Sequence, residues 1–228
     1  YDRFRNRLMF PIIDVRGNVI GFGGRVMDDS TPKYLNSPET IIFNKRRNLF
    51  AMNVVKKSKR EFIILTEGYM DAIALHQYGF DCAVASLGTS LTQEHADMLS
   101  KYTDELVLTY DGDEAGQNAT QRAIPMLERT GLRVRTLRMR GAKDPDEFLK
   151  KYGADRFRLL LEHLGERPEV RLTRFRPDER KSGGVYETVS GIVKQIDLIA
   201  RRIRLLDGTD IPMDDVLTLD GALFDVLD

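Results

Sequence analysis

Three acidic residues each follow an apolar run that predicts a β-strand. Glu67 comes directly after residues 62–66, and Asp111 and Asp113 come directly after residues 106–110. Because ligands of an open α/β sheet bind beyond the carboxyl ends of its strands, these carboxylates are predicted to meet at one edge. Hard oxygen ligands suit Mg²⁺, which takes one or two carboxylates together with substrate phosphates and water. The pattern therefore favours a metal site for phosphoryl-transfer chemistry.

A second acidic pair, Asp144 and Asp146, follows the next apolar run along the chain and is predicted to reach the same edge. An Asp-Gly-Asp segment alone is a common surface turn, and a Glu followed by Gly is equally unremarkable alone. It is their occurrence at matching strand ends, and in this order, that indicates a site.

The elements that would position these acids alternate regularly. Apolar runs too short for helices are separated by segments with helical spacing, several of which end at a glycine. The predicted strands cover residues 61–66, 82–86, 105–110 and 133–139, and the predicted helices cover residues 70–78, 92–102, 115–129 and 145–152. Such alternation predicts right-handed crossovers and a mainly parallel sheet flanked by helices, which we assign to residues 59–164.

The segments before and after this α/β domain have different patterns. Apolar runs at 8–15 and 19–26, joined across a Gly-Asn turn, predict a hairpin. A loop is expected at 28–38 and a short helix at 47–57, so residues 1–58 are expected to form a partial mixed α+β subdomain. After a linker at 164–168, short apolar runs at 170–176, 185–196, 201–206 and 210–219 predict a small β-rich domain over 165–228.

Composition excludes several classes of protein. No apolar run approaches the roughly 18 residues of a membrane span, and the start of the chain is no signal peptide. A single cysteine, Cys82, excludes an internal disulfide framework and a Cys-based zinc site. A reducing, cytoplasmic setting fits this composition.

The charge distribution suggests a polyanionic partner, although the formal net charge is zero. Residues 1–60 contain thirteen Lys and Arg residues against five Asp and Glu residues, whereas the chain from Leu205 onward contains seven Asp residues and no basic residue. A solvated charged surface would also explain the basic front.

Four stretches at 31–40, 67–71, 85–90 and 110–116 resemble the bacterial DnaG-type replicative primases, over about residues 1–164. The Glu after one strand and the Asp-x-Asp after a later one resemble the TOPRIM module that these primases share with topoisomerases and certain nucleases. The resemblance implies that Glu67, Asp111 and Asp113 are metal-binding catalytic acids. It implies a supporting role for Asp144 and Asp146, and Mg²⁺ as the cofactor, with Mn²⁺ as an alternative. The residues that match positions gripping the nucleotide or the nucleic-acid backbone are Arg25, Lys33, Asn36 and Lys45, and Tyr34 is a candidate for stacking on a base.

The function that this resemblance implies is synthesis of short RNA primers on a single-stranded DNA template from ribonucleoside triphosphates, in the bacterial cytoplasm. Cleavage of a phosphodiester by the same acids, as in a TOPRIM nuclease or topoisomerase, is an alternative, and so is non-catalytic binding of single strands. Compared with the family's pattern, we expect this chain to lack the zinc-binding domain, the first part of the polymerase core and the helicase-binding domain, and such a truncation would limit independent activity. No zinc is expected.

Some residues are expected to play structural roles. Asp71, four residues after Glu67, is predicted to cap or orient the following helix, and His76 and His95 are predicted to be packing or surface histidines. The end of the chain, about residues 197–217, resembles a YolD-like small domain.

Overall fold

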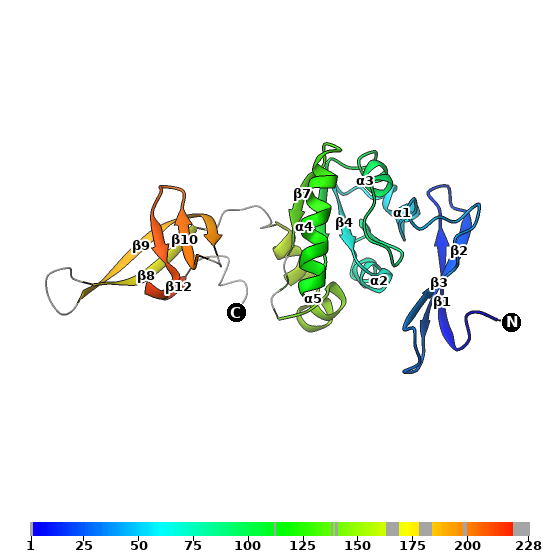
Figure 1. The fold of residues 1–228 in the computed structure, drawn as a ribbon, viewed down its shortest axis with the longest axis horizontal. Coiled ribbons are helices and arrows are strands. Elements are labelled where there is room, and N and C mark those ends of the chain that lie inside the picture. Colours follow the sequence, from blue (N-terminus) through cyan, green and yellow to red (C-terminus); the bar gives the residue numbers. More distant parts are fainter. Residues whose placement is uncertain are drawn as a thin grey trace. The chain divides into compact units, whose positions relative to one another are not determined.

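The structure is a computed structural model that describes residues 2–111, 113–137, 139, 141–162, 169–177, 184–197 and 200–220. Contacts divide the chain into two compact units, Tyr1–Leu161 and Glu162–Asp228 (Figure 1). Each unit is described by itself. None of the described helices is both long enough and apolar enough to cross a membrane.

A four-stranded parallel sheet is the centre of the first unit. Its order is β5-β4-β6-β7, and the strands are β4 (Phe62–Thr66), β5 (Ala83–Ala85), β6 (Glu105–Thr109) and β7 (Arg133–Thr136). The last residue of β4, Thr66, pairs with the last residue of β5, Ala85, and with the last residue of β6, Thr109. This register confirms the predicted parallel α/β fold, and it aligns the carboxyl ends of three strands at one edge.

Helices cover this sheet as the alternation predicted. They are α2 (Tyr69–Gln77), α3 (Gln93–Leu99), α4 (Glu114–Glu128) and α5 (Pro145–Glu162). Side chains from one face of the sheet pack with apolar residues of α3 and α4, and Ile63, Leu106 and Leu127 are among the buried members of this core.

Helix α5 differs from the expectation because it continues beyond Tyr152. The chain kinks at Gly153, whose φ of 82° is accessible at little cost to glycine, and resumes as helix. The second half buries Phe157, whose ring lies 4.9 Å from that of Phe80 and 6.0 Å from that of Phe148. This packing stabilises a helical segment that the sequence pattern alone did not indicate.

The N-terminal segment forms an antiparallel sheet in the order β1-β2-β3, from β1 (Arg7–Ile13), β2 (Val19–Val26) and β3 (Tyr34–Asn36). The predicted hairpin is confirmed, with Asp14 accepting hydrogen bonds from the backbone N–H groups of Arg16 and Asn18 in its turn. The predicted loop at 28–38 contains β3, which pairs with β2.

The predicted helix at 47–57 is reduced to one turn, α1 (Met52–Val55). Just before it, Phe50 forms a β-bridge to Ala85 at the edge of β5, with hydrogen bonds in both directions. A residue engaged in such a bridge cannot also be helical, so the helix starts later than its sequence pattern suggests.

The second unit is an antiparallel sheet in the order β11-β10-β9-β8-β12. Its strands are β8 (Glu169–Pro177), β9 (Gly184–Asp197), β10 (Arg202–Leu205), β11 (Asp210–Pro212) and β12 (Val216–Asp220). A small core that includes Leu172, Leu205 and Ile211 is fully buried. The β-rich character predicted for this segment is confirmed, while the linker predicted at 164–168 lies entirely outside the described residues.

Candidate metal and nucleotide site

Glu67 and Asp111 lie next to each other at the carboxyl end of the parallel sheet. The backbone N–H of Asp111 donates a hydrogen bond of 3.2 Å to Oε1 of Glu67. The segment that carries Glu67 is also fixed from its other side, because Ser86 Oγ donates to the backbone carbonyl of Glu67 at 2.9 Å. Two loops from neighbouring strands therefore hold the two carboxylates at one place.

Asp113 lies at the start of α4 and serves as its N-cap. Its Oδ1 accepts a hydrogen bond of 2.8 Å from the backbone N–H of Gly116. A carboxylate at this position also interacts favourably with the positive end of the helix dipole. Asp113 is near enough to Glu67 and Asp111 for its charge to raise the pKa of both.

Gly116 makes this close approach of α4 possible. A Cβ at this position would lie 2.1 Å from the backbone oxygen of Asp111 and 2.9 Å from Oε1 of Glu67. Only glycine fits without moving the chain that carries both carboxylates. The sequence motif did not indicate this role for Gly116; the signal for it is a glycine in the first turn of a helix, where other residues are preferred.

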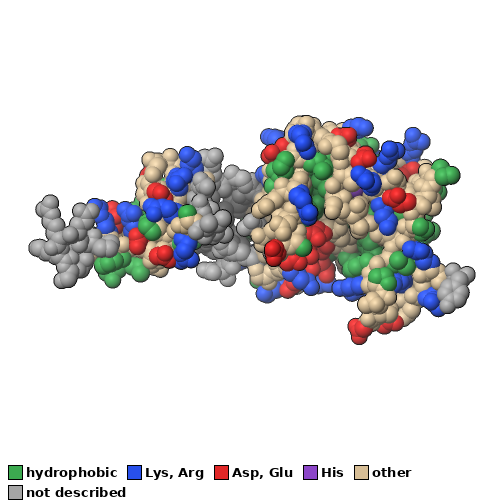
Figure 2. Space-filling model, viewed as in Figure 1, with side chains coloured by type: hydrophobic (Ala, Val, Ile, Leu, Met, Phe, Trp, Pro, Cys, Tyr) green, Lys and Arg blue, Asp and Glu red, His purple; other side chains and the backbone are tan. Residues whose placement is uncertain are grey.

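A cleft of about 940 Å³ opens in front of these acids, and we call it the mixed-charge cleft. Acidic side chains gather on this face of the first unit, with Lys and Arg side chains beside them (Figure 2). Six acidic residues line the cleft: Glu67, Asp71, Asp111, Asp144, Asp146 and Glu147. The cations that line it are Arg25, Lys33, Lys143, Lys150 and Lys151.

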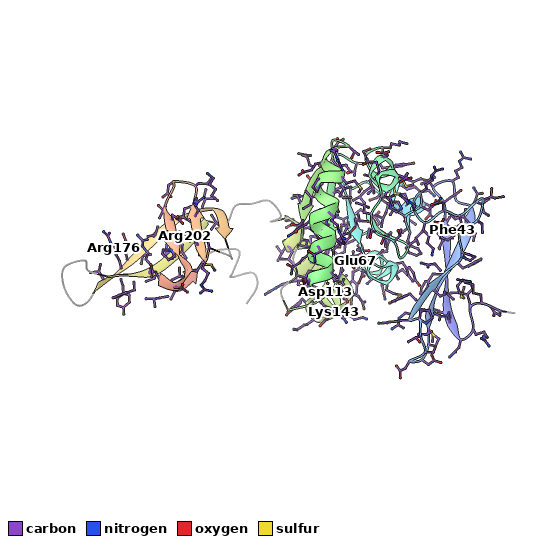
Figure 3. All side chains as sticks on the ribbon, viewed as in Figure 1. Phe43, Glu67, Asp113, Lys143, Arg176 and Arg202 are labelled. Atoms are coloured by element: carbon purple, nitrogen blue, oxygen red, sulfur yellow. The ribbon has the colours of Figure 1, made fainter. Side chains whose placement is uncertain are left out.

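Eight of the ten predicted site residues line the mixed-charge cleft. Asp113 and Lys45 do not. The labelled side chains of Glu67, Asp113 and Lys143 come from three different segments and lie at the same end of the parallel sheet (Figure 3).

The inner acids repel one another. Burial is the first cause that raises the pKa of Glu67, and the charge of Asp111 adds to it. The pKa of Asp111 is raised by burial and then by the charge of Asp144. Asp71 shows the largest effect, since burial and the charges of Asp144 and Asp111 raise its pKa to about 7.

The position of Asp71 differs from the predicted helix-capping role. It does not cap α2, because the N-cap residue is Gly68 and no side chain caps that end. It lies close to Asp144 and Asp146 instead, and no local sequence signal indicated this because both are distant in sequence.

The donor set fits a hard divalent cation held in an open manner. Among the described residues, no group of three or more Asp, Glu, His or Cys side chains is placed so that it could hold a metal ion by itself. Mg²⁺ does not require such a cage, because it keeps several waters and takes phosphate oxygens from its substrate. Glu67 and Asp111 would supply negative charge for such an ion.

The cations on the opposite side of the cleft come from the N-terminal sheet. Arg25 on β2 pairs in register with Tyr34 on β3, and Lys33 Nζ lies 5.7 Å from the Tyr34 ring centre. Asn36 is fixed by a hydrogen bond of 2.8 Å from its Nδ2 to the backbone carbonyl of Leu87.

The aromatic residues of the cleft differ in exposure. Tyr69 is buried against Phe10 and Phe50, at ring distances of 5.1 and 5.5 Å. Tyr34 contacts Tyr69 edge-on at 5.5 Å but remains 42% exposed in the cleft wall. Of the two rings, Tyr34 is the one that is open to a ligand.

Lys45 belongs to a segment held by a histidine. Its backbone oxygen accepts a hydrogen bond of 2.8 Å from Nε2 of the fully buried His95. The other ring nitrogen of His95 accepts from the backbone N–H of Thr92 and completes a capping box at the start of α3. Since both ring nitrogens are used, His95 is a structural residue, as the sequence reading expected.

Two family models match the first unit. A model described as "Toprim-like" matches residues 64–149, and one described as "DNA primase catalytic core, N-terminal domain" matches residues 1–56. The first range contains all five predicted acids, and the second contains the predicted cations, Tyr34 and Asn36.

Relatives and solved structures agree with these models. The chain is 50% identical over 175 residues to a DNA primase of Clostridium acetobutylicum, which covers 76% of this chain and 29% of that protein. The catalytic core of the Escherichia coli primase matches with 45% identity and a TM-score of 0.68, over 72% of this chain and 54% of that one. A DnaG primase catalytic domain bound to single-stranded DNA matches with 44% identity and the same TM-score, over 72% of this chain and 53% of that one. The chain thus spans less than a third of the curated relative and about half of each solved core.

Proposed function

From the premise that the chain belongs, through its first unit, to the DnaG-type DNA primase family, we propose that this unit binds a divalent metal and a ribonucleoside triphosphate and joins nucleotides into short RNA primers on a single-stranded DNA template. The observation that carries the proposal is the mixed-charge cleft, in which acids at the ends of β4 and β6 face cations from the N-terminal sheet. A metal–triphosphate complex carries both kinds of charge and matches both sides.

The acids would hold the metal. TOPRIM domains of primases depend on divalent metals, and we propose Mg²⁺, with Mn²⁺ as an alternative. Glu67, Asp111 and Asp113 would hold it, with Asp144 and Asp146 in support. When bound, the ion neutralises phosphate charge and stabilises the charge that develops on the leaving pyrophosphate.

The cations would orient the triphosphate. Arg25 and Lys33 make no ion pair among the described residues, so their charges are available to phosphate oxygens. Lys33 holds its ammonium beside the Tyr34 ring, and Tyr34 offers an exposed aromatic face for a base. Asn36 would donate or accept a hydrogen bond at the same wall, and Lys45, outside the cleft, would contact the nucleic-acid backbone.

A single-stranded DNA template is proposed from the similarity to a DNA-bound relative and from the basic charge of the N-terminal segment. The related catalytic domain with 44% identity was solved with single-stranded DNA bound. The basic N-terminal segment of this chain would supply phosphate contacts of the sequence-independent kind. Phosphodiester cleavage by the same acids remains the second candidate, because a metal held at Glu67 and Asp111 could also activate water.

The test combines synthesis and cleavage in one reaction. The chain is incubated with a single-stranded template, labelled ribonucleoside triphosphates and Mg²⁺, beside Asp111→Asn. Asp155→Asn is the matched control, because the Asp155 side chain is 94% exposed on α5 and pairs with Arg158. We expect primers from the parent and from Asp155→Asn, and a loss of at least about a hundredfold in Asp111→Asn, since an electrostatic contact to a transition state is typically worth that much.

Other outcomes would revise the proposal. Nicked template without primers would favour the nuclease. Neither product, together with Mg²⁺-dependent binding of the triphosphate, would restrict the unit to substrate binding. Calorimetric titration with Mg²⁺ tests the metal directly, and equal affinity in the parent and Asp111→Asn would contradict the assignment of the acids.

A further inference from the structure

A second cavity, of about 460 Å³, adjoins the mixed-charge cleft at Glu67. Glu67, Ser86 and Gly88 line both spaces and so form the wall between them. The rest of the second cavity is made by the loop after β5 and by one face of α4, and we call it the α4 cavity. The site's central carboxylate is therefore accessible from two directions.

The wall between the two spaces is held rigidly. Ser86 Oγ bonds the backbone of Glu67, and the carbonyl of Leu87 accepts a hydrogen bond from Asn36 in the cleft. Gly88 has a φ of +70°, a conformation that L side chains rarely adopt. Farther along, Thr92 Oγ1 donates to the carbonyl of Arg46 at 2.7 Å, so the loop is anchored at both ends.

The two spaces differ in chemistry. Five cations line the mixed-charge cleft, whereas Arg122 is the one cation among the described residues that line the α4 cavity. The α4 cavity offers the hydroxyls of Ser86, Thr89 and Ser90, and an apolar wall that includes Leu91 and Met126. An apolar wall with a few polar groups is typical of a site for a small ring system.

These differences match the two reactants of the proposed function. A triphosphate carries several negative charges and needs the many cations of the cleft. A nucleotide that presents a base, a sugar and one phosphate needs an apolar surface, hydroxyls and one guanidinium, which is what the α4 cavity provides.

We propose that the α4 cavity binds the nucleotide at the primer's 3′ end, which supplies the attacking 3′-hydroxyl. Its base would lie against Leu91 and Met126, and its phosphate would pair with Arg122. In the reaction, the 3′-oxygen forms a bond to the α-phosphorus of the triphosphate in the cleft. The bond between that phosphorus and the bridging oxygen breaks, pyrophosphate leaves with the electron pair, and the hydroxyl proton passes to solvent. This inference rests on the proposed function, and it assigns the acceptor to a separate subsite.

The test measures binding apart from turnover. A diribonucleotide with one phosphate is titrated into the full chain by calorimetry, in the presence of saturating Mg²⁺ and a non-hydrolysable ATP analogue. We expect the diribonucleotide to bind while the analogue is bound, with one site for each. Arg122→Gln should reduce the affinity for the diribonucleotide about tenfold, equivalent to about 1.4 kcal/mol, and leave the affinity for the ATP analogue unchanged. Lys33→Gln should weaken binding of the ATP analogue about tenfold and leave the affinity for the diribonucleotide unchanged.

A matched control comes from the same helix. Arg129 is exposed at the C-cap of α4 and does not line the cavity, so Arg129→Gln should bind both ligands as the parent does. Competition between the diribonucleotide and the analogue, equal diribonucleotide affinity in Arg122→Gln and the parent, or no diribonucleotide binding at millimolar concentration would each overturn the inference. If the parent chain did not bind the ATP analogue, the proposed function would be contradicted instead, so the two failures are distinguishable.

Discussion

The two units of the chain use charge in opposite ways. In the second unit, Arg and acidic side chains face each other across neighbouring strands, as in Arg174–Glu187 at 2.8 Å and Arg202–Asp210 at 2.9 Å. In the first unit, acids at the end of the parallel sheet face other acids, and their pKa values are raised. Paired charges on a sheet surface need no ligand. Like charges held together by buried loops are unfavourable until something positive binds between them.

The comparison also holds inside the mixed-charge cleft. Two acids at the start of α5 have partners, since Asp146 in its first turn pairs with Lys150 at 2.6 Å and Asp144, just before it, lies 3.9 Å from Lys143 Nζ. Glu67, Asp71 and Asp111 make no ion pair among the described residues. The acids nearest the sheet therefore lack a cationic partner among the described residues, whereas Asp144 and Asp146 are already partly neutralised.

Replacing Gly116 by alanine is expected to have the largest effect. Helix propensity alone predicts that Gly116→Ala stabilises α4 by up to about 1 kcal/mol. Because the new Cβ would meet the Asp111 backbone at 2.1 Å, we expect instead a loss at or above the upper end of the roughly 1–3 kcal/mol typical of overpacking. Urea unfolding measures the stability, and calorimetry should show weaker Mg²⁺ binding.

Asn118→Ala is the control for Gly116→Ala, since Asn118 is exposed on the same helix. It should be neutral or slightly stabilising. If Gly116→Ala were as stable as the parent and bound Mg²⁺ equally well, the close approach of α4 would not shape the acid site.

The arrangement around Gly116 shows what the sequence could and could not predict. The strand–helix alternation depends on local periodicity, so the parallel sheet and the position of Glu67 and Asp111 at its edge followed from the residues alone. The strand β3 did not, because three residues in a segment rich in breakers pair with β2 through long-range hydrogen bonds. Local sequence patterns do not indicate which distant strand a short segment pairs with.

Side-chain roles were harder to predict than strand ends. Asp71 was predicted to cap or orient α2 because it lies in the first turn of that helix. The acids that act on it, Asp144 and Asp146, are distant in sequence, so local spacing could not indicate them. Asp113 lies in the expected motif, but its carboxylate is used at the helix start, and Lys45 lies outside the cleft. Tertiary packing determined these outcomes.

Removing the charge of Asp71 is expected to have the next largest effect. Its pKa of about 7 in the folded protein exceeds the ordinary 3.8, so the folded state keeps a proton that the unfolded state has lost between these values. The stability that this proton linkage contributes is complete below pH 3.8 and is lost as the pH rises through about 7. Asp71→Asn should therefore be more stable than the parent at pH 8 without metal, by about 1–2 kcal/mol, and the difference should shrink toward pH 4.

Thermal unfolding at pH 4 and pH 8 in a chelator measures this effect, with about 2–4 °C expected for each kcal/mol. Asp155→Asn, on the exposed face of α5, should show no such pH-dependent gain. Addition of Mg²⁺ should reduce the advantage of Asp71→Asn, because the ion compensates the same repulsion. An advantage that is equal at both pH values would mean that Asp71 is not strained by its acidic neighbours.

The smallest effect is expected where charges are already paired. Arg174 and Glu187 lie opposite each other on β8 and β9, and the Arg174 side chain donates through Nε at 3.1 Å and Nη2 at 2.8 Å to one oxygen of Glu187. A double-mutant cycle with Arg174→Gln and Glu187→Gln should give a coupling of about 0.2–1 kcal/mol, the usual range for pairs that remain partly exposed. Calorimetric titration of both variants should show unchanged binding of Mg²⁺ and triphosphate, because their charges are satisfied within the second unit. A coupling energy well above this range would show that the pair is a main stabilising contact of that sheet. Altered triphosphate affinity would show that the second unit takes part in substrate binding. Either result would contradict the contrast between paired charges that stabilise the fold and unpaired charges that bind ligands.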